Sequence, residues 1–137
     1  MARGGGRRGK RLKRLVRLRE SGDQALTWDC GACRKEGLDV VRGCGPNTTA
    51  EPGYSHVTVL GQVFDRCPKA WARDDAHAEA ELLRQADALE RWGVLPVAGG
   101  LDDQPAAFVD ALDVISDAQT QARLALQRAQ EARSRRG

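Results

Sequence analysis

The chain has 137 residues, of which 41% are hydrophobic and 30% charged but only 4% aromatic. That length and composition fit one small domain with a modest core. No stretch has the length of a membrane-spanning helix, and the positive N-terminus lacks the apolar run of a secretory signal, so we expect a cytoplasmic protein with no membrane partner.

The net charge of +3 hides an asymmetry between the first 22 residues and the rest. Residues 1–22 contain nine Arg or Lys and one acid, a charge of +8, so the other 115 residues carry −5. Residues 1–9 are rich in Gly and Arg, whereas Leu12, Leu15 and Val16 fall at helical spacing. We predict that residues 1–22 form a basic, largely disordered arm with a short helix from Lys10 to Arg19.

This arm has two interpretations. Charge runs are usually solvated, so it can be a tail that only aids solubility. Alternatively it neutralises phosphates in a small nucleic-acid-binding protein. The cations that would do so are Arg7, Arg8, Lys10, Arg11, Lys13 and Arg14.

All four cysteines lie in one segment. The order is C-x2-C at Cys30 and Cys33, then ten residues to Cys44 and twenty-two more to Cys67. In a reducing compartment, clustered cysteines are more often metal ligands than disulfides. A C-x2-C turn can direct two thiolates at one ion, and zinc takes four such ligands in a tetrahedron. Residues 23–69 are therefore predicted to form a knuckle or ribbon with a structural Zn2+ held by these cysteines.

Other interpretations of the segment stay open. His56 could replace Cys44 or Cys67 as a ligand, but for His56 and His77 alike we expect an ordinary surface or partly buried histidine. The cysteines could also be free, buried thiols. A redox C-x2-C expects a helix directly after it, whereas Gly37 and strand-like residues follow here. Four thiolates leave no open coordination position, and no acid–base set stands out, so we do not expect an enzyme.

The secondary-structure pattern changes after Cys67. Before it, Leu38 to Val41 predicts a short strand, and Tyr54 to Phe64 predicts a longer one with a bulge at Gly61. The remaining residues 70–137 predict a helical hairpin. Its first helix spans residues 70–92 and ends at Gly93, and its second reaches about residue 133, with a break near residue 120 left open. Trp28, Trp71 and Trp92 are the expected core anchors, with Trp28 over the metal knuckle.

The predicted fold class is therefore a small α+β protein. A four-cysteine zinc knuckle or ribbon with short β-strands is followed by an α-helical hairpin. We expect the apolar residues of the helices and their linker to bind a protein partner, although Val94, Leu95 and Leu101 of the linker could instead plug the end of the hairpin. These residues are Leu82, Leu89, Val94, Leu95, Leu101 and Phe108.

Two motifs together carry a resemblance to a known family. The first is the sequence WDCGAC of residues 28–33 with Cys67-Pro68 downstream, and the second is GVLP of residues 93–96 with GGLDDQP of residues 99–105. Over about residues 28–118 the chain resembles small uncharacterised proteins of tailed bacteriophages and prophages, encoded among tail morphogenesis genes. The resemblance implies a structural protein in phage tail or virion assembly, similar to a tail-assembly chaperone. It would act in the host cytoplasm, with the virion as a second location, on another virion component.

Overall fold

The computed structural model describes residues 6–45 and 49–136, and these residues are mostly helical. The longer helices are α1 (Gly6–Glu20), α5 (His77–Trp92) and α6 (Ala106–Arg136). The shorter elements are η1 (Gln24–Thr27), α2 (Cys30–Lys35), α3 (Leu38–Arg42), β1 (His56–Val57), β2 (Val63–Phe64), α4 (Pro68–Asp74) and η2 (Leu101–Asp103). The α+β prediction was wrong, because the strands among these residues form a single two-stranded sheet.

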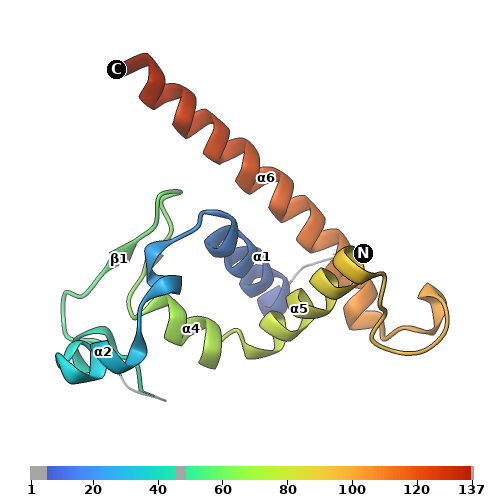
Figure 1. The fold of residues 1–137 in the computed structure, drawn as a ribbon, viewed down its shortest axis with the longest axis horizontal. Helices are drawn as coiled ribbons and strands as arrows, with labels where there is room; N and C mark the ends of the chain where they lie inside the picture. The colour runs from blue at the N-terminus through green and yellow to red at the C-terminus, as the bar shows by residue number, and fades with distance from the viewer. Residues whose placement is uncertain (1–5, 46–48, 137) are drawn as a thin grey trace.

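The predicted basic arm is mostly a core helix. Helix α1 lies between the cysteine segment and the two long C-terminal helices (Figure 1). Its apolar side chains are buried in the main core, among them Leu12, Leu15, Val16 and Leu18. An apolar stripe along one face buries even a highly charged helix, because the cations can keep their heads at the surface. The helix expected from Lys10 to Arg19 is thus confirmed, and it begins earlier, at Gly6. The disorder expected for residues 6–9 is wrong, and residues 1–5 lie outside the described part.

Helix α1 also changes the predicted helical hairpin. Helices α5 and α6 pack against each other, but α6 packs more extensively on α1. Ala111, Ile115 and Ala118 of α6 share one hydrophobic cluster with the leucines of α1 and with Leu83 of α5. The three long helices therefore form one core, and α5 and α6 are not a separate hairpin.

The helix predicted over residues 70–92 is interrupted. Helix α4 ends at Asp74, and α5 begins at His77. The backbone N–H groups of Asp75 and Ala76 both donate to the Trp71 carbonyl, which closes α4, and Ala76 is fully buried at the joint. Helix α5 ends at Gly93 in the left-handed conformation (φ 67°), as predicted from the glycine.

Helix α6 is continuous from Ala106 to Arg136, without a break near residue 120. Its last buried residue is Ala122. At 1.5 Å per residue, the 13 helical residues from 124 to 136 extend about 20 Å beyond that point. Figure 1 shows this half of α6 projecting from the rest of the molecule.

The strand predictions are corrected in two places. Leu38 to Val41 lie in helix α3, which Gly37 and Gly43 bound in the left-handed conformation. Residues 54–64 form an antiparallel hairpin, in which His56 pairs with Phe64 and Val57 with Val63. Gly61 lies in its turn at φ 81°. Buried and exposed side chains alternate through β1, the turn and β2 with the two-residue period of a single strand. The sequence pattern therefore predicted one strand where there are two.

No helix among the described residues is both long enough and apolar enough to cross a membrane.

Candidate metal centre

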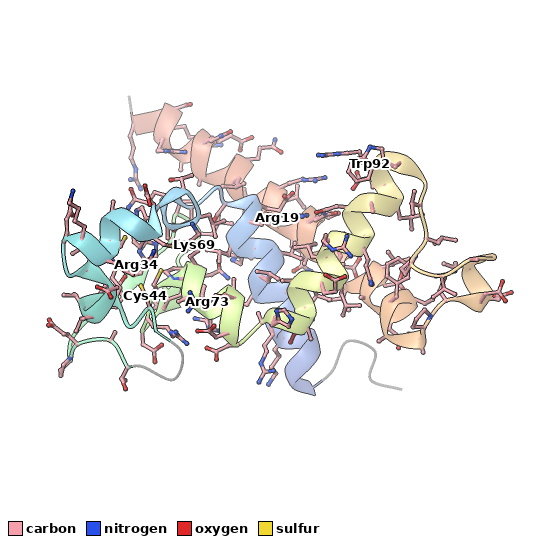
Figure 2. The ribbon with its side chains drawn as sticks, turned by 60° about the horizontal axis from the view of Figure 1, so that its bottom comes forward. Arg19, Arg34, Cys44, Lys69, Arg73 and Trp92 are labelled. Atoms are coloured by element: carbon pink, nitrogen blue, oxygen red, sulfur yellow. The ribbon has the colours of Figure 1, made fainter. Side chains whose placement is uncertain are left out.

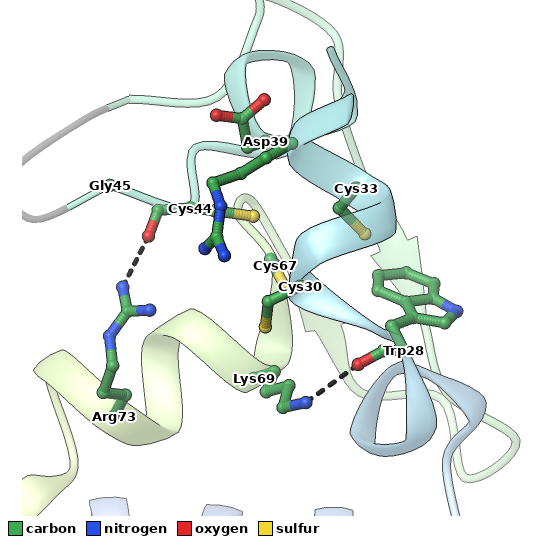
Figure 3. Close-up of a pocket in the computed structure, with 10 residues that line it drawn as sticks. Trp28, Cys30, Cys33, Asp39, Cys44, Gly45, Cys67, Lys69 and Arg73 are labelled. Carbon is green, nitrogen blue, oxygen red and sulfur yellow. Dashed lines mark hydrogen bonds between the residues drawn. The ribbon is translucent and has the colours of Figure 1, made fainter. Parts of the chain in front are cut away.

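The structure brings the four cysteines around one pocket of about 280 Å3 (Figure 3). Cys30 and Cys33 belong to α2, Cys44 follows α3, and Cys67 immediately precedes α4. Three segments far apart in the sequence therefore contribute to the lining. All four thiols are free.

Local structure explains the position of the first pair. The Asp29 carboxylate caps α2, accepting from the backbone N–H groups of Gly31 at 2.8 Å and Ala32 at 3.3 Å. Cys30 is the first residue of this helix, and Cys33 is three residues further on. Residues at this spacing share one helix face, so both thiols can face the pocket.

Backbone hydrogen bonds attach both members of the second pair to helix α3. The Cys67 N–H donates to the Arg42 carbonyl at 2.8 Å, and the Cys44 N–H donates to the Asp39 carbonyl at 2.9 Å. Glycine is required at position 43, directly before Cys44, because its φ is 66° and a Cβ there would lie 2.6 Å from the Ala50 nitrogen. The close approach of Gly43 to Ala50 turns the chain at the end of α3, so that Cys44 lies beside Cys67.

The electrostatic setting of the thiols is mixed. Burial, together with the neighbouring Cys67 thiol, raises the pKa of Cys44 from 9.0 to about 11. The Arg42 guanidinium donates to Cys33 Sγ at 3.2 Å. Three more cations, Arg34, Lys69 and Arg73, line the pocket with one acid, Asp39. Cations of this kind stabilise thiolates once the thiols lose their protons.

The thiols surround the pocket without converging on one point. Within the described residues, no three His, Cys, Asp or Glu side chains are grouped as a metal site. A tetrahedral Zn–S distance near 2.3 Å would place the sulfurs roughly 3.8 Å apart. Of the four thiols, those of Cys44 and Cys67 already interact with each other. Four free thiols from three segments that line one pocket are the donor type that zinc takes, so the donor set fits this metal.

The two histidines have other contacts. His56 is buried, and its Nε2 lies 2.7 Å from Asp23 Oδ2. Its ring also meets the edge of Trp28 at a centroid distance of 5.3 Å. His77 is exposed at the start of α5. His56 thus supports the wall of the pocket from behind Trp28, and it is not among the residues that line the pocket.

The tryptophans differ from one another. Trp28 lines the cysteine pocket, as predicted, with the Arg42 guanidinium 3.7 Å above its ring. Trp71 is buried in the helical core against Phe64. Trp92 was predicted to be a core anchor, but its side chain is 68% exposed near the end of α5, at the edge of the molecule labelled in Figure 2.

The residues predicted to bind a partner differ in how exposed their side chains are. Val94 and Leu101 are exposed, whereas Leu82, Leu89 and Leu95 are half-buried. Phe108 is 1% exposed, so it belongs to the protein's own interior and cannot serve as a docking residue. Leu89 lines a groove of about 290 Å3 between α5 and α6, together with Leu112 and Ile115.

Some of the cations predicted to bind nucleic acid make contacts within the protein, and others are exposed. Arg14 donates to the Val63 carbonyl at 2.6 Å and lies 4.0 Å from the Phe64 ring centroid, so the fold itself uses it. Arg11 lies 3.8 Å from the buried Glu79 carboxylate. Lys10 and Lys13 are exposed. The side chains of Arg7 and Arg8 lie outside the described part of the structure.

Sequence reasoning missed the arginines that surround the cysteines. Arg42 contacts a thiol, Arg66 donates to the Gly43 carbonyl beside Cys44, and Arg73 donates to the carbonyl of Cys44 itself. No spacing rule links Arg66 or Arg73 to Cys44, because the contacts cross 21 to 29 residues. Arg42, nine residues after Cys33, could have been suspected only from its closeness in sequence.

Comparisons with protein families, with curated proteins and with solved structures found no match to this chain.

Proposed function

We propose that this protein is a non-enzymatic interaction protein whose cysteine pocket holds a structural Zn2+. One observation supports the proposal above all. Four cysteines from three separate segments, Cys30 and Cys33, Cys44, and Cys67, line the same pocket. Four thiolates complete a tetrahedron and leave no position for a substrate, so zinc here would hold the fold together.

The cations of the pocket support the same proposal. A zinc ion with four thiolates carries a net charge of −2, which must be balanced in a partly buried site. Arg42 already donates to Cys33, and Lys69 and Arg73 line the same pocket. Zinc would thus link α2, the end of α3 and the start of α4.

The first experiment is native mass spectrometry of protein purified under reducing conditions, with circular dichroism before and after chelation. We expect one zinc per chain, and loss of the zinc together with part of the folded structure. Cys44→Ser should weaken zinc binding, whereas the matched control Ser55→Ala, at an exposed serine, should not. A chain that binds no zinc and keeps its fold and stability would overturn the metal centre.

The interaction surface proposed is at the opposite end of the helices. Trp92, Val94, Val97 and Leu101 are 68%, 55%, 46% and 50% exposed around the loop between α5 and α6. A shallow groove of about 230 Å3, lined in part by Ala88, Leu95 and Pro96, lies beside them. Large exposed apolar residues gathered in one place are typical of protein-binding sites.

This loop is held in one conformation. The Val97 N–H donates to the buried Gln104 side chain at 2.8 Å, and the same amide donates to the Val97 and Gly100 carbonyls. The Gly100 N–H donates to the Asp103 carboxylate at 2.8 Å. A loop fixed before binding loses less entropy when a partner arrives, which favours an interaction role.

The resemblance to phage proteins supplies the biological setting for the proposal, a role in tail or virion assembly. The test is a complementation assay that measures yield of infectious particles. Trp92→Ser and Leu101→Ser should lower the yield while the purified proteins stay folded, and Leu124→Ser, an equally exposed leucine on α6, is the control. Unchanged yield with both loop variants would contradict the proposed surface.

The nucleic-acid alternative cannot be tested by deleting residues 1–20, because that would remove most of the core helix α1. Lys10→Gln with Lys13→Gln removes two exposed cations and leaves the buried stripe intact. Salt-sensitive nucleic-acid binding that these changes weaken, with the loop variants unaffected, would favour that alternative.

A further inference from the structure

We propose that Arg66 and Arg73 are positioning residues for the metal centre. They hold the backbone on both sides of Cys44, so that its thiol lies beside Cys67 before a metal ion arrives. This inference rests on the proposed zinc site and names what prepares it.

Three successive carbonyl groups accept hydrogen bonds from these two arginines. Arg66 Nε donates to the Gly43 carbonyl at 3.1 Å, and Arg66 Nη2 donates to the Gly45 carbonyl at 3.2 Å. Arg73 Nη2 donates to the carbonyl of Cys44 itself, as Figure 3 shows. The two guanidinium groups therefore contact the segment from Gly43 to Gly45 at every residue.

A carboxylate holds both arginines in place. Asp74 Oδ2 accepts from Arg66 Nη2 at 3.0 Å, and Asp74 Oδ1 accepts from Arg73 Nε at 2.7 Å. Asp75 lies 3.6 Å from Arg66 Nη1. Because Arg73 and Asp74 belong to α4 and Arg66 precedes Cys67, the contacts fasten the Cys44 segment to the part of the chain that carries Cys67.

Cys44 is the ligand that needs such help. Cys30 and Cys33 are placed by one capped helix, and Cys67 is fixed by its N–H bond to Arg42 and by the start of α4. Cys44 follows the end of α3, where its N–H bonds locally to the Asp39 carbonyl, and the carbonyls of residues 43–45 accept from arginines more than 20 residues away. Outer groups that orient metal ligands in this way commonly change affinity by about 10- to 100-fold.

A positioning role differs from a general effect of positive charge. The two carbonyls that Arg66 reaches belong to Gly43 and Gly45, and a planar guanidinium can donate to both at once. A lysine at this position keeps the charge but offers one compact ammonium group. Charge alone would therefore be restored by lysine, whereas the geometry would not.

The test measures zinc affinity by competition with a chromophoric chelator, using the full chain under reducing conditions. Arg66→Gln and Arg73→Gln should each weaken zinc binding by about 10-fold or more, and Arg66→Lys should restore little of it. With cobalt(II) in place of zinc, the visible spectrum of Arg66→Gln should show fewer thiolate ligands than the wild type. The control is Arg84→Gln, which removes an exposed ion pair with Glu81 on α5.

Asp74→Asn provides a second route if either arginine variant fails to fold. It keeps both arginines but loosens their orientation, so a smaller loss of affinity is expected. Wild-type affinity and a four-thiolate cobalt spectrum in the arginine variants would overturn the positioning role and leave the zinc site standing. Full restoration by Arg66→Lys would also overturn it, in favour of charge. A wild-type chain that binds no zinc would instead contradict the proposed function itself.

Discussion

The burial of α1 leads to a quantitative prediction for Leu18→Ala. The Leu18 side chain is completely buried in the core shared with α5 and α6. The substitution removes three carbon atoms, worth about 0.8 kcal/mol each in transfer free energy. A cavity that relaxes only in part adds about 1 kcal/mol. We therefore expect the free energy of unfolding to fall by about 3 kcal/mol, with a melting temperature lower by about 10 °C.

The assay is urea denaturation of the zinc-saturated chain, followed by circular dichroism. Leu124→Ala is the matched control, because the same change is made on a helix at a side chain that is 46% exposed. Its cost should stay near or below about 0.5 kcal/mol. If Leu18→Ala costs no more than this control, residues 6–20 are a detachable tail, and the core described here is wrong.

Three further predictions concern pH, an ion pair and the projecting helix. Because the pKa of Cys44 is raised to about 11, the metal-free protein should lose stability as the pH rises from about 9 to 11. Cys44→Ser should remove that loss of stability. A free energy of unfolding of the wild type that stays constant over this pH range would contradict the prediction. Hydrogen bonds from Arg73 and Arg66 lower the pKa of Asp74 from 3.8 to about 2, so its contribution should be present above pH 4 and lost as the pH falls through 2. Since Asp74 lies near the surface, Asp74→Asn should cost only about 1 kcal/mol or less at neutral pH in a denaturation experiment, and a larger cost would show a stronger role. Removing residues 124–136 should leave the melting temperature within a few degrees of the wild type, because Ala122 is the last buried residue of α6; a collapse of the fold would show that the projecting half is packed.

Much of the helical part could be predicted from residues close together in the sequence. Gly93 ended α5 where expected, and α6 ends at Arg136, close to the end predicted near residue 133, without the break that was left open near residue 120. Such features depend on backbone conformation and on side chains one turn apart, so a local pattern contains them. The clustering of the four cysteines likewise suggested their common pocket, although it gave no information on the position of their sulfurs.

Other predictions failed because the local signal was ambiguous. The four residues from Leu38 to Val41 are too few to show a helical or a strand period, and the glycines on either side favoured α3. Trp92 was assigned to the core by residue type alone, yet it lies at the last position of α5, beyond the reach of α1. Residue type gives only a tendency to be buried.

The sequence by itself determined the long helical segments and the end of α5, and it placed four thiols in one part of the chain. Only the tertiary structure decided that the basic N-terminal segment is part of the core, because its charge density concealed a stripe of leucines that needs α5 and α6 to cover it. The same holds for the arginines around Cys44. Their partners are backbone carbonyls more than 20 residues away, and a carbonyl group has no residue identity that a sequence pattern could reveal.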